Sequence, residues 1–193
     1  MRQLLFFSNN KNKIIEIKKI FKKFNLELLS LNDLNISNEP EETGKTFEEN
    51  AKIKSDYGFN KTGIPCFADD SGICLETFNW KPGVSSKNFL NSFKNKEACL
   101  KNIIKSSKKN CKRKAYFKTS ISFTINNDQN LIFNGKIDGK VSDQVKGDFG
   151  FGYDPIFIPV NYKKTLAEIK TKEKNEISHR SIAITKLINF LTN

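Results

Sequence analysis

Histidine, methionine and tryptophan occur once each among the 193 residues, and cysteine occurs four times. The cysteines at positions 66, 74, 99 and 111 form no Cys-x-x-Cys pair and have no cluster of histidines beside them, which argues against zinc. No apolar run is long enough to cross a membrane, and the apolar run at the start is too short for a signal peptide. We therefore expect a cytoplasmic protein with reduced cysteines and no membrane partner.

Acidic residues are in the minority: 21 stand against 33 lysines and arginines, so the formal net charge is +12. The hydrophobic fraction of 37% indicates a globular chain, and the length suits one domain over residues 1–193. The densest basic run, Lys105–Lys114, has no aromatic residue for base stacking before Tyr116. We interpret that run as a solvated surface loop and expect no nucleic-acid partner, although a phosphate-rich small ligand suits so basic a protein.

Strand and helix signals alternate in the first part of the chain. An apolar run at residues 3–8 ends in a polar turn, isoleucines then recur at helical spacing from Ile14 onward, and Leu26–Leu31 resembles a second strand. Thr46 begins another helix, and Glu49 completes a capping box with it. The order strand, helix, strand is typical of an α/β domain.

The rest of the chain adds strands to this α/β fold. Residues 64–76 (IPCFADDSGICLE) indicate two short strands around Asp-Asp-Ser-Gly, and a helix is expected over residues 95–104. Residues 115–125 alternate polar with apolar side chains, as a half-buried strand does, and a turn leads into a partner strand at 131–137. A last helix, with an apolar face, begins at Ser178.

A polar turn separates the first strand from the first helix. It precedes a helix N-terminus, where free backbone N–H groups and the positive end of the helix dipole attract anions. Lys13 stands where the dipole disfavours a cation, which makes more sense if its side chain faces a phosphate. The pattern is not a P-loop, because Gly-x-x-x-x-Gly-Lys-[Ser/Thr] is absent, so anion binding is a hypothesis here. The candidate phosphate ligands are Ser8, Asn9, Asn10, Lys11, Asn12 and Lys13.

Two neighbouring carboxylates occur in the run FADDSG, residues 67–72. Because neighbouring side chains of an extended strand point to opposite faces, Asp69 and Asp70 should not share a role: one faces a site and the other has local partners. A carboxylate here can hold Mg²⁺ and orient a water molecule, whereas the alternative is an Asx-type turn between strands. The acidic loop with Glu41 and Glu42 offers further carboxylates for the same metal.

Glycines alternate with aromatic residues in GDFGFGYDPIF, residues 147–157. Glycine permits positive φ and the close approach of another group, so this segment resembles a shaped loop more than a strand. Two interpretations are open. The segment is either a tight turn whose rings fill the core, or a loop that presents a ring to a flat ligand, with Asp154 as a nearby acceptor.

A basic helix start follows in KNEISHR, residues 174–180. A lone histidine is more often structural than functional, but His179 is the chain's only one and stands beside an arginine and close to a lysine. Lys174 and Arg180 can neutralise phosphates, Arg180 as a bidentate fork. Four features together suit a Mg²⁺-dependent nucleotide enzyme: a basic turn, an acidic strand end, an aromatic glycine loop and a basic helix start.

Six motifs occur in the order and spacing of the inosine triphosphate pyrophosphatase family, which the chain resembles from residue 4 to the last helix: SNNKNKIIEI, EETGKTFEENA, FADDSGI, KPGV, DFGFGYDPIF and EKNEISHR. The resemblance implies an α/β fold with an elongated mixed β-sheet, flanking helices and two lobes around a central nucleotide-binding cleft, usually in a homodimer. It also implies hydrolysis of deaminated purine nucleoside triphosphates (ITP, dITP and XTP) to the nucleoside monophosphate and pyrophosphate.

The resemblance also implies roles for particular residues. Asp70 resembles the general base and a Mg²⁺ ligand, and Glu41 resembles a further metal ligand. Residues 8–13 would line the triphosphate, and Phe151 would stack on the purine. The other implied substrate contacts are Ser71, Gly152, Tyr153, Asp154, Lys174, His179 and Arg180.

One segment departs from the family's pattern. After KPGV many members have an aromatic-Ser-Arg run, whereas this chain has SSKNF at residues 85–89, where Lys87 keeps the charge without the bidentate fork. The nearest rival function is a related pyrophosphatase for modified pyrimidine nucleotides. From another class, the net charge of +12 allows a nucleic-acid-binding module without catalysis, which would leave the acidic motifs without a purpose.

Overall fold

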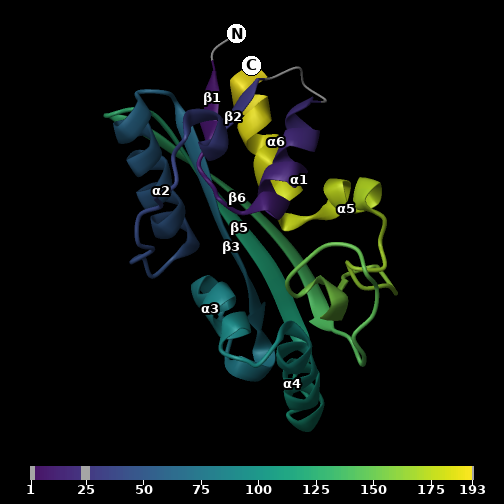
Figure 1. Cartoon of the computed structure of the whole chain (residues 1–193). Coiled ribbons are helices and arrows are strands. Elements are labelled where there is room, and N and C mark those ends of the chain that lie inside the picture. Colours follow the sequence, from purple (N-terminus) through teal and green to yellow (C-terminus); the bar gives the residue numbers. More distant parts are fainter. Residues whose placement is uncertain (1–2, 23–26, 193) are drawn as a thin grey trace. The chain divides into compact units, whose positions relative to one another are not determined.

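The computed structural model describes residues 3–22 and 27–192, which form a mixed β-sheet with packed helices (Figure 1). The strand order is β2–β1–β3–β5–β6–β7, with β4 paired to β3. β1 runs parallel to β2 and β3, whereas the β3–β4 and β6–β7 pairs are antiparallel. The predicted α/β class is thereby confirmed. The strands are β1 Leu4–Phe6, β2 Leu28–Ser30, β3 Cys66–Leu75, β4 Lys81–Pro82, β5 Lys114–Asn126, β6 Gln129–Val141 and β7 Phe157–Pro159.

Six α-helices occur in the part of the chain that the structure describes. None of them is long and apolar enough to cross a membrane. They are α1 Lys11–Lys22, α2 Phe47–Thr62, α3 Ser86–Asn91, α4 Lys96–Lys109, α5 Thr171–Ile177 and α6 His179–Thr192.

The chain divides into two compact units, and strands β3, β5 and β6 each contribute residues to both. The boundary falls twice among the predicted site residues, after Asp70 and before Arg180, so it divides them into two sets. The predicted cleft between two lobes stays a prediction, as does a single catalytic domain over residues 1–193. The first unit comprises the chain up to Asp70, Thr119–Gly135 and the chain from Arg180, and the second comprises Ser71–Lys118 and Lys136–His179.

In the first unit, buried side chains cover both faces of the sheet. Leu4 and Phe6 of β1 belong to a cluster with α1 and α6, whereas Leu5 and Phe7 belong to another cluster with Leu31 and residues of α2. This alternation follows from the period of two in a strand. Figure 1 accordingly shows α2 on one side of these strands and α1 with α6 on the other.

A polar network joins α2 to β5 and β6 inside the first unit. The Ser55 hydroxyl donates to Ser122 Oγ at 2.8 Å, and Thr124 Oγ1 donates to Asp56 Oδ1 at 2.6 Å. The amide Nδ2 of Asn130 donates to the hydroxyl oxygens of Ser122 and Thr124 at 2.7 Å and 2.8 Å. Buried polar groups are tolerated at this contact because they satisfy one another.

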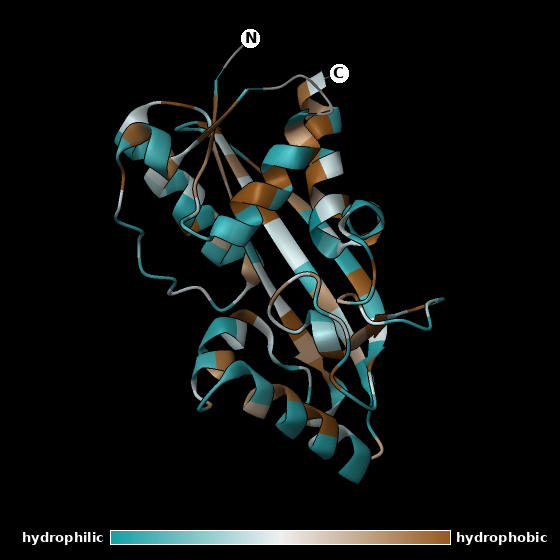
Figure 2. Ribbon diagram, turned by 45° about the vertical axis from the view of Figure 1, so that its right-hand side comes forward, coloured by the Kyte–Doolittle hydropathy of each residue, from teal (hydrophilic) through white to brown (hydrophobic). Residues whose placement is uncertain are grey.

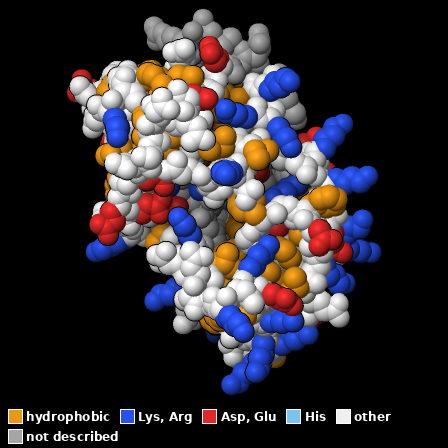
Figure 3. Space-filling model, in the orientation of Figure 1, with side chains coloured by type: hydrophobic (Ala, Val, Ile, Leu, Met, Phe, Trp, Pro, Cys, Tyr) orange, Lys and Arg blue, Asp and Glu red, His pale blue; other side chains and the backbone are white. Residues whose placement is uncertain are grey.

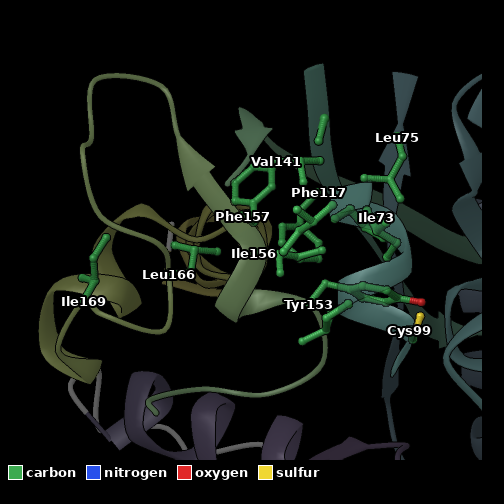
Figure 4. Packing of buried hydrophobic residues seen from close by; sticks show 14 residues of the cluster. Ile73, Leu75, Cys99, Phe117, Val141, Tyr153, Ile156, Phe157, Leu166 and Ile169 are labelled. Atoms are coloured by element: carbon green, nitrogen blue, oxygen red, sulfur yellow. The ribbon is translucent and has the colours of Figure 1, made fainter. Parts of the chain in front are cut away.

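The core of the second unit forms around the segment 153–157 (Figure 4). Ile156 and Phe157 are fully buried, and the Phe157 ring meets that of Phe117 edge to face with centroids 4.7 Å apart. One face of α4 contributes Cys99 and its apolar neighbours to the same cluster. The second half of the glycine-aromatic segment therefore does fill a core, as the first interpretation held.

Helix α4 is longer than predicted and corrects the interpretation of the basic run. Its N-cap is Asn95, whose Oδ1 accepts from the Ala98 N–H at 2.8 Å, and it continues to Lys109. The prediction of a loop over Lys105–Lys114 is therefore wrong for its first half, because lysine is a good helix former and the opposite face of α4 is apolar. The ribbon of α4 accordingly alternates between hydrophilic and hydrophobic residues in Figure 2, and Lys and Arg side chains gather around it in Figure 3.

Strand β3 also differs from the prediction. Residues 66–75 form one continuous strand in place of two short ones, and all of them except Ser71 are buried. Burial on both faces outweighs the turn propensity of Asp-Asp-Ser-Gly, which rules out an Asx-type turn between two strands here. Gly72 is needed because a Cβ atom there would lie 2.2 Å from the carbonyl oxygen of Gly83. The predicted start of the second strand, Leu26, lies outside the described residues.

Candidate active site

The two neighbouring carboxylates of β3 have different partners in the first unit. Oδ2 of the buried Asp69 lies 2.9 Å from Lys13 Nζ and 3.3 Å from Arg180 Nε. Oδ2 of Asp70 instead accepts a hydrogen bond from Asn50 Nδ2 at 3.2 Å. The expectation that one of the two carboxylates has local partners is confirmed for Asp69, as the alternation of a strand requires.

Asp69 belongs to a buried charge cluster, made of Lys13, Glu16, Asp69 and Arg180. Besides its contact with Asp69, Arg180 donates through Nη1 to Glu16 Oε2 at 2.7 Å. Burial by itself raises the pKa of Asp69, but the charges of Lys13, Arg180 and Lys54 hold it well below the usual range. Asp69 is therefore a permanent anion, which balances the buried Arg180 and the partly buried Lys13.

Asp70 lies in a different electrostatic environment. Its side chain is buried, and this burial raises its pKa although the charges of Lys54 and Lys13 act in the opposite direction. A carboxylate with a raised pKa is a stronger proton acceptor for as long as it is ionised. Perturbed titratable groups among other polar residues are candidates for catalysis, so Asp70 fits the predicted role of a base.

Helix α2 supplies partners to both aspartates. It begins with the predicted capping box: Thr46 Oγ1 accepts from the Glu49 N–H at 3.2 Å, and Glu49 Oε2 accepts from the Thr46 N–H at 3.1 Å. The cap fixes the first turn, so that Asn50 and Lys54, at a spacing of one turn, both lie on the buried face. Asn50 orients Asp70 through the hydrogen bond given above.

Lys54 is a member of the site that was not predicted from the sequence. Its Nζ donates to the backbone carbonyl of Asp69 at 2.7 Å and to Glu42 Oε1 at 2.6 Å. Burial lowers its pKa, but Asp70, Asp69 and Glu42 together raise it above the ordinary value, so Lys54 is cationic. There was little signal for it in the sequence, because the buried face of α2 consists largely of polar and small residues and forms no clear apolar stripe.

The predicted phosphate turn forms the N-terminus of α1. Asn10 Oδ1 accepts from the backbone N–H groups of Asn12 at 3.1 Å and Lys13 at 3.2 Å, and the Asn10 N–H donates to Ser8 Oγ at 3.2 Å. These contacts cap the helix from within the turn. Lys11 and Asn12 are exposed.

A carboxylate of the acidic loop is bound to this turn. Glu39 Oε1 accepts from the Asn9 N–H at 2.7 Å, and the Asn9 side chain donates to the Ser37 carbonyl at 3.2 Å. An anion at a helix N-terminus agrees with the field of the helix dipole. Binding of a phosphate at the same turn stays a prediction.

The acidic loop and Asp70 together offer hard oxygen ligands. The charge of Glu42 contributes to the raised pKa of Asp70, so these two carboxylates are near each other, and Glu41 is exposed on the same loop. No group of three or more His, Cys, Asp or Glu residues able to hold a metal occurs in the described ranges. The residues present fit Mg²⁺, which proteins bind through one or two carboxylates together with water and substrate phosphates. Glu41 as a metal ligand stays a prediction.

In the second unit, Asp154 anchors the aromatic loop, residues 147–154. Its Oδ2 accepts from the Phe151 N–H and from Lys174 Nζ, both at 2.7 Å, and the two charged side chains are buried. Gly150 has a φ of +80°, and a Cβ atom there would lie 2.2 Å from Asp154 Oδ2. The loop therefore requires glycine at this position both for its backbone and for its close contact with the carboxylate.

The rings of the aromatic loop differ in exposure. Phe149 is 48% exposed, Phe151 is half-buried with Lys174 Nζ 5.2 Å from its centroid, and Tyr153 is buried. The Tyr153 hydroxyl donates to the Ser86 carbonyl at 2.6 Å. Tyr153 thus packs in the core, as the first interpretation held, while Phe149 and Phe151 reach the surface. Presentation of a ring to a flat ligand stays a prediction.

The other predicted contacts lie in different surroundings. His179 begins α6, and its buried ring stacks on Phe117 with centroids 4.7 Å apart and an interplanar angle of 10°. Ser71 is half-buried in β3, and Lys87, in the segment that departs from the family's pattern, is exposed in α3. Direct contact of these residues with a substrate stays a prediction.

Comparison with known proteins assigns the family. The sequence profile of the Ham1 family matches residues 4–190, and the chain belongs to this family. It is 42% identical to a dITP/XTP pyrophosphatase of Christiangramia forsetii, over 98% of this chain and 99% of that protein. A dITP/XTP pyrophosphatase of Leptospira interrogans is 39% identical over 98% and 97% of the two chains.

Solved structures agree with the sequence relatives. A HAM1 protein from Coxiella burnetii superposes with a TM-score of 0.89 at 31% identity, over 100% of this chain and 99% of that chain. The Staphylococcus aureus Ham1 protein gives a TM-score of 0.85 at 34% identity, over 99% and 98%. The resemblance seen in the sequence motifs and the predicted mixed α/β fold are therefore confirmed.

Proposed function

We propose that this protein hydrolyses deaminated purine nucleoside triphosphates, namely ITP, dITP and XTP, to the nucleoside monophosphate and pyrophosphate. The proposal is supported by membership of the Ham1 family and by relatives named dITP/XTP pyrophosphatase. The main structural support is the environment of Asp70. This carboxylate is buried and has a raised pKa, Asn50 orients it, and it lies within the field of Lys54.

Asp70 acts as the general base. Its carboxylate takes a proton from a water molecule while the water oxygen bonds to phosphorus and the bond between the α and β phosphates breaks, so that pyrophosphate leaves. Burial makes the carboxylate more basic, and the hydrogen bond from Asn50 holds its orientation. Lys54 offsets part of the cost of placing a negative charge there.

Mg²⁺ would be held by Asp70 and Glu41 together with phosphate oxygens, and it supplies positive charge to the reacting phosphates. The triphosphate contacts the turn Ser8–Lys13. Because Glu39 Oε1 occupies the Asn9 N–H in this structure, a phosphate that binds there has to displace a carboxylate.

Base selection follows from hydrogen-bond chemistry. Hypoxanthine and xanthine have a 6-keto oxygen, whereas adenine has a 6-amino group, so a donor facing position 6 rejects adenine. Arg180 and His179 carry suitable donors, and Phe151 offers a ring for stacking on the purine. In this structure Nε and Nη1 of Arg180 are engaged with Asp69 and Glu16, so contact of Arg180 with a base competes with these ion pairs.

The test is pyrophosphate release from ITP, dITP, XTP, GTP and ATP, with Mg²⁺ and with EDTA. We expect ITP, dITP and XTP to be cleaved well above GTP and ATP, and EDTA to abolish turnover. Asp70→Asn should lose most of kcat and keep ITP binding, whereas the matched control Asp128→Asn, in an exposed turn, should be unchanged. Near-native kcat in Asp70→Asn would contradict the assignment of the base, and equal rates on all substrates would contradict the substrate class.

A homodimer in the cytoplasm completes the proposal. The dimer rests on the family resemblance, and the location rests on four free cysteines, of which only Cys111 is exposed. Sedimentation velocity should give twice the chain mass of 22.1 kDa, and a mass of one chain at micromolar concentration would contradict the dimer.

A further inference from the structure

A carboxylate of α1 is buried beside apolar side chains. The buried residues of this helix are Glu16, Ile17, Ile20 and Phe21, and Glu16 is the one charged side chain among them. Its Oε2 accepts from Nη1 of Arg180 at 2.7 Å. Replacing a buried ion pair by apolar residues of similar volume is often neutral or stabilising, so stability alone gives no reason for a carboxylate here. The proposed mechanism leaves Glu16 without a role.

The partner of Glu16 lies at the start of a helix. Arg180 is in the first turn of α6, which packs on the same side of the sheet as α1 (Figure 1). The positive end of a helix dipole attracts anions, so a phosphate would meet both a helix N-terminus and a guanidinium at this place. Burial lowers the pKa of Arg180, but Glu16 and, to a smaller extent, Asp69 raise it above the ordinary value, so the guanidinium stays charged.

The formal charges of the buried charge cluster, which lies wholly in the first unit, cancel. Its two cations, Lys13 and Arg180, face two anions, Glu16 and Asp69. The cations differ in their surroundings: the side chain of Lys13 is 13% exposed and contacts one of these carboxylates, whereas that of Arg180 is 3% exposed and lies between both. Charge therefore favours Lys13 over Arg180 as the partner of a phosphate.

Asp69 alone could not serve both cations equally. Its Oδ2 lies 2.9 Å from Lys13 Nζ and 3.3 Å from Arg180 Nε, so its shorter contact is with the lysine. Glu16 makes the shorter contact with Arg180, at 2.7 Å. Because Lys13 and Glu16 are three positions apart on α1, they lie on the same side of the helix, and a single turn places both groups.

We propose that Glu16 is a positioning residue that sets the choice of base: it orients Arg180 and keeps phosphate away from it, so that the guanidinium binds an uncharged acceptor, the 6-keto oxygen of a deaminated purine. The inference rests on the proposed function, in which Arg180 donates to position 6 of the base. A guanidinium between two carboxylates still donates hydrogen bonds, but its charge is offset and attracts an anion less. The contacts at Nε and Nη1 also fix the plane of the guanidinium, and with it the direction of donation.

Glu16→Gln tests this role, because it keeps the size of the side chain and removes its charge. The ratio of kcat/KM for ITP to kcat/KM for ATP, measured with Mg²⁺, should fall at least about tenfold, since Arg180 is less well oriented and can bind phosphate in place of the base. Affinity for inorganic tripolyphosphate, measured by calorimetry in EDTA, should rise about three- to tenfold, because a cation at a helix N-terminus loses a counter-ion. A loosened fold would not produce this gain in affinity.

Two further variants separate charge from shape. Glu97→Gln removes an ion-paired carboxylate from the exposed surface of α4 and so changes the net charge equally, and both measurements should match the wild type. Glu16→Asp keeps the charge on a shorter side chain. Its tripolyphosphate affinity should stay within about twofold of the wild type, while its preference for ITP should fall about two- to fivefold because the guanidinium is oriented less well.

The preference of the wild type for ITP tests the proposed function, and the difference between wild type and Glu16→Gln tests the role of Glu16. A wild type that prefers ITP, with a variant that keeps the full preference, would overturn this role alone, whereas a wild type without preference would contradict both. Unchanged tripolyphosphate affinity in Glu16→Gln would show that Glu16 does not keep phosphate from Arg180. If circular dichroism shows that Glu16→Gln is unfolded, Glu16→Asp decides the matter, and a wild-type preference in Glu16→Asp would equally overturn the proposal.

Discussion

Each compact unit contains a buried carboxylate held by cations, and the two carboxylates are held differently. Asp69 in the first unit has two cationic partners, Lys13 and Arg180, whereas Asp154 in the second unit has one, Lys174, together with a backbone N–H. Removing Asp69 would deprive two cations, Lys13 and Arg180, of a counter-ion, and removing Asp154 would deprive one, Lys174. The number of charges that depend on a buried carboxylate, more than its own burial, should therefore set the effect of its loss.

The largest effect is expected for Asp69→Asn. The change leaves Arg180 with Glu16 and leaves Lys13 with only the field of Asp70, and breaking a buried ion pair on one side costs about 3–5 kcal/mol. The free energy of unfolding from urea titration measures this, with Asp128→Asn as the exposed control. Because the folded-state pKa of Asp69 is lowered, its contribution is present above the ordinary Asp pKa and is lost as the pH falls below that value.

The difference in the free energy of unfolding between wild type and Asp69→Asn should therefore be constant from about pH 8 to about pH 5 and disappear in stronger acid. A loss below about 1 kcal/mol at neutral pH would show that Lys13 and Arg180 find other compensation.

A smaller loss is expected for Asp154→Asn, about 1.5–3 kcal/mol, because one charge-assisted hydrogen bond to Lys174 is weakened and the amide can still accept from the Phe151 N–H. Hydrogen exchange of the aromatic loop, residues 147–154, should rise in the variant while exchange in the core of the first unit stays unchanged. A loss of unfolding free energy as large as that of Asp69→Asn would show that the number of dependent cations does not set the effect.

Asp70→Asn should act in the opposite direction on stability. Burial raises the folded-state pKa of Asp70, so the wild type loses stability as the pH rises from the ordinary Asp pKa through the raised value. The amide of Asp70→Asn cannot ionise, so the variant avoids this loss of stability. It should be more stable than the wild type at neutral pH by about 0.5–2 kcal/mol, with lower activity. Thermal unfolding in EDTA across pH measures it, and a lower Tm than wild type at neutral pH would contradict the assigned environment.

The smallest effect is expected at the turn of the first unit. Glu39→Gln removes the carboxylate charge that competes for the Asn9 N–H, so affinity for inorganic tripolyphosphate should rise about two- to fivefold at low salt. Calorimetry measures the binding, and Glu97→Gln, which removes an exposed charge on α4, is the control. Unchanged affinity would show that this N–H group does not contact phosphate.

Local signals in the sequence predicted much of the fold. The capping box at Thr46 and Glu49 depends on residues close in the chain, and it is present in the structure. The helix expected over residues 95–104 also forms, as α4. The alternation predicted for β5 holds only over residues 114–118, because residues 119–124 are all buried. The continuous strand β3 was not predicted, because its turn-forming residues are held extended by burial on both faces, which is a tertiary effect.

The site was predicted where motifs contain its residues and missed where only tertiary contacts define it. The different environments of Asp69 and Asp70 follow from strand alternation. Their surroundings also include Glu16, Asn50 and Lys54, which two helices supply. Glu16 is a polar residue beside apolar ones on the buried face of α1, whereas the buried face of α2 also contains Ser55 and so gives a weaker signal. Neither pattern says which charge lies opposite. Pairing requires knowledge of the helix packing, which no local pattern supplies.

The polar network between α2 and the strands β5 and β6 limits how this protein can change by mutation. An apolar contact tolerates exchanges of similar volume one at a time, as the α4 face with Ile103 can. A single apolar replacement at Ser55, in contrast, would remove one hydrogen bond from each of the Ser122 and Thr124 hydroxyls, which would then depend on Asn130 and Asp56 alone. The helix that carries Lys54 is thus kept in place by a contact in which one substitution at Ser55 weakens two buried hydrogen bonds at once.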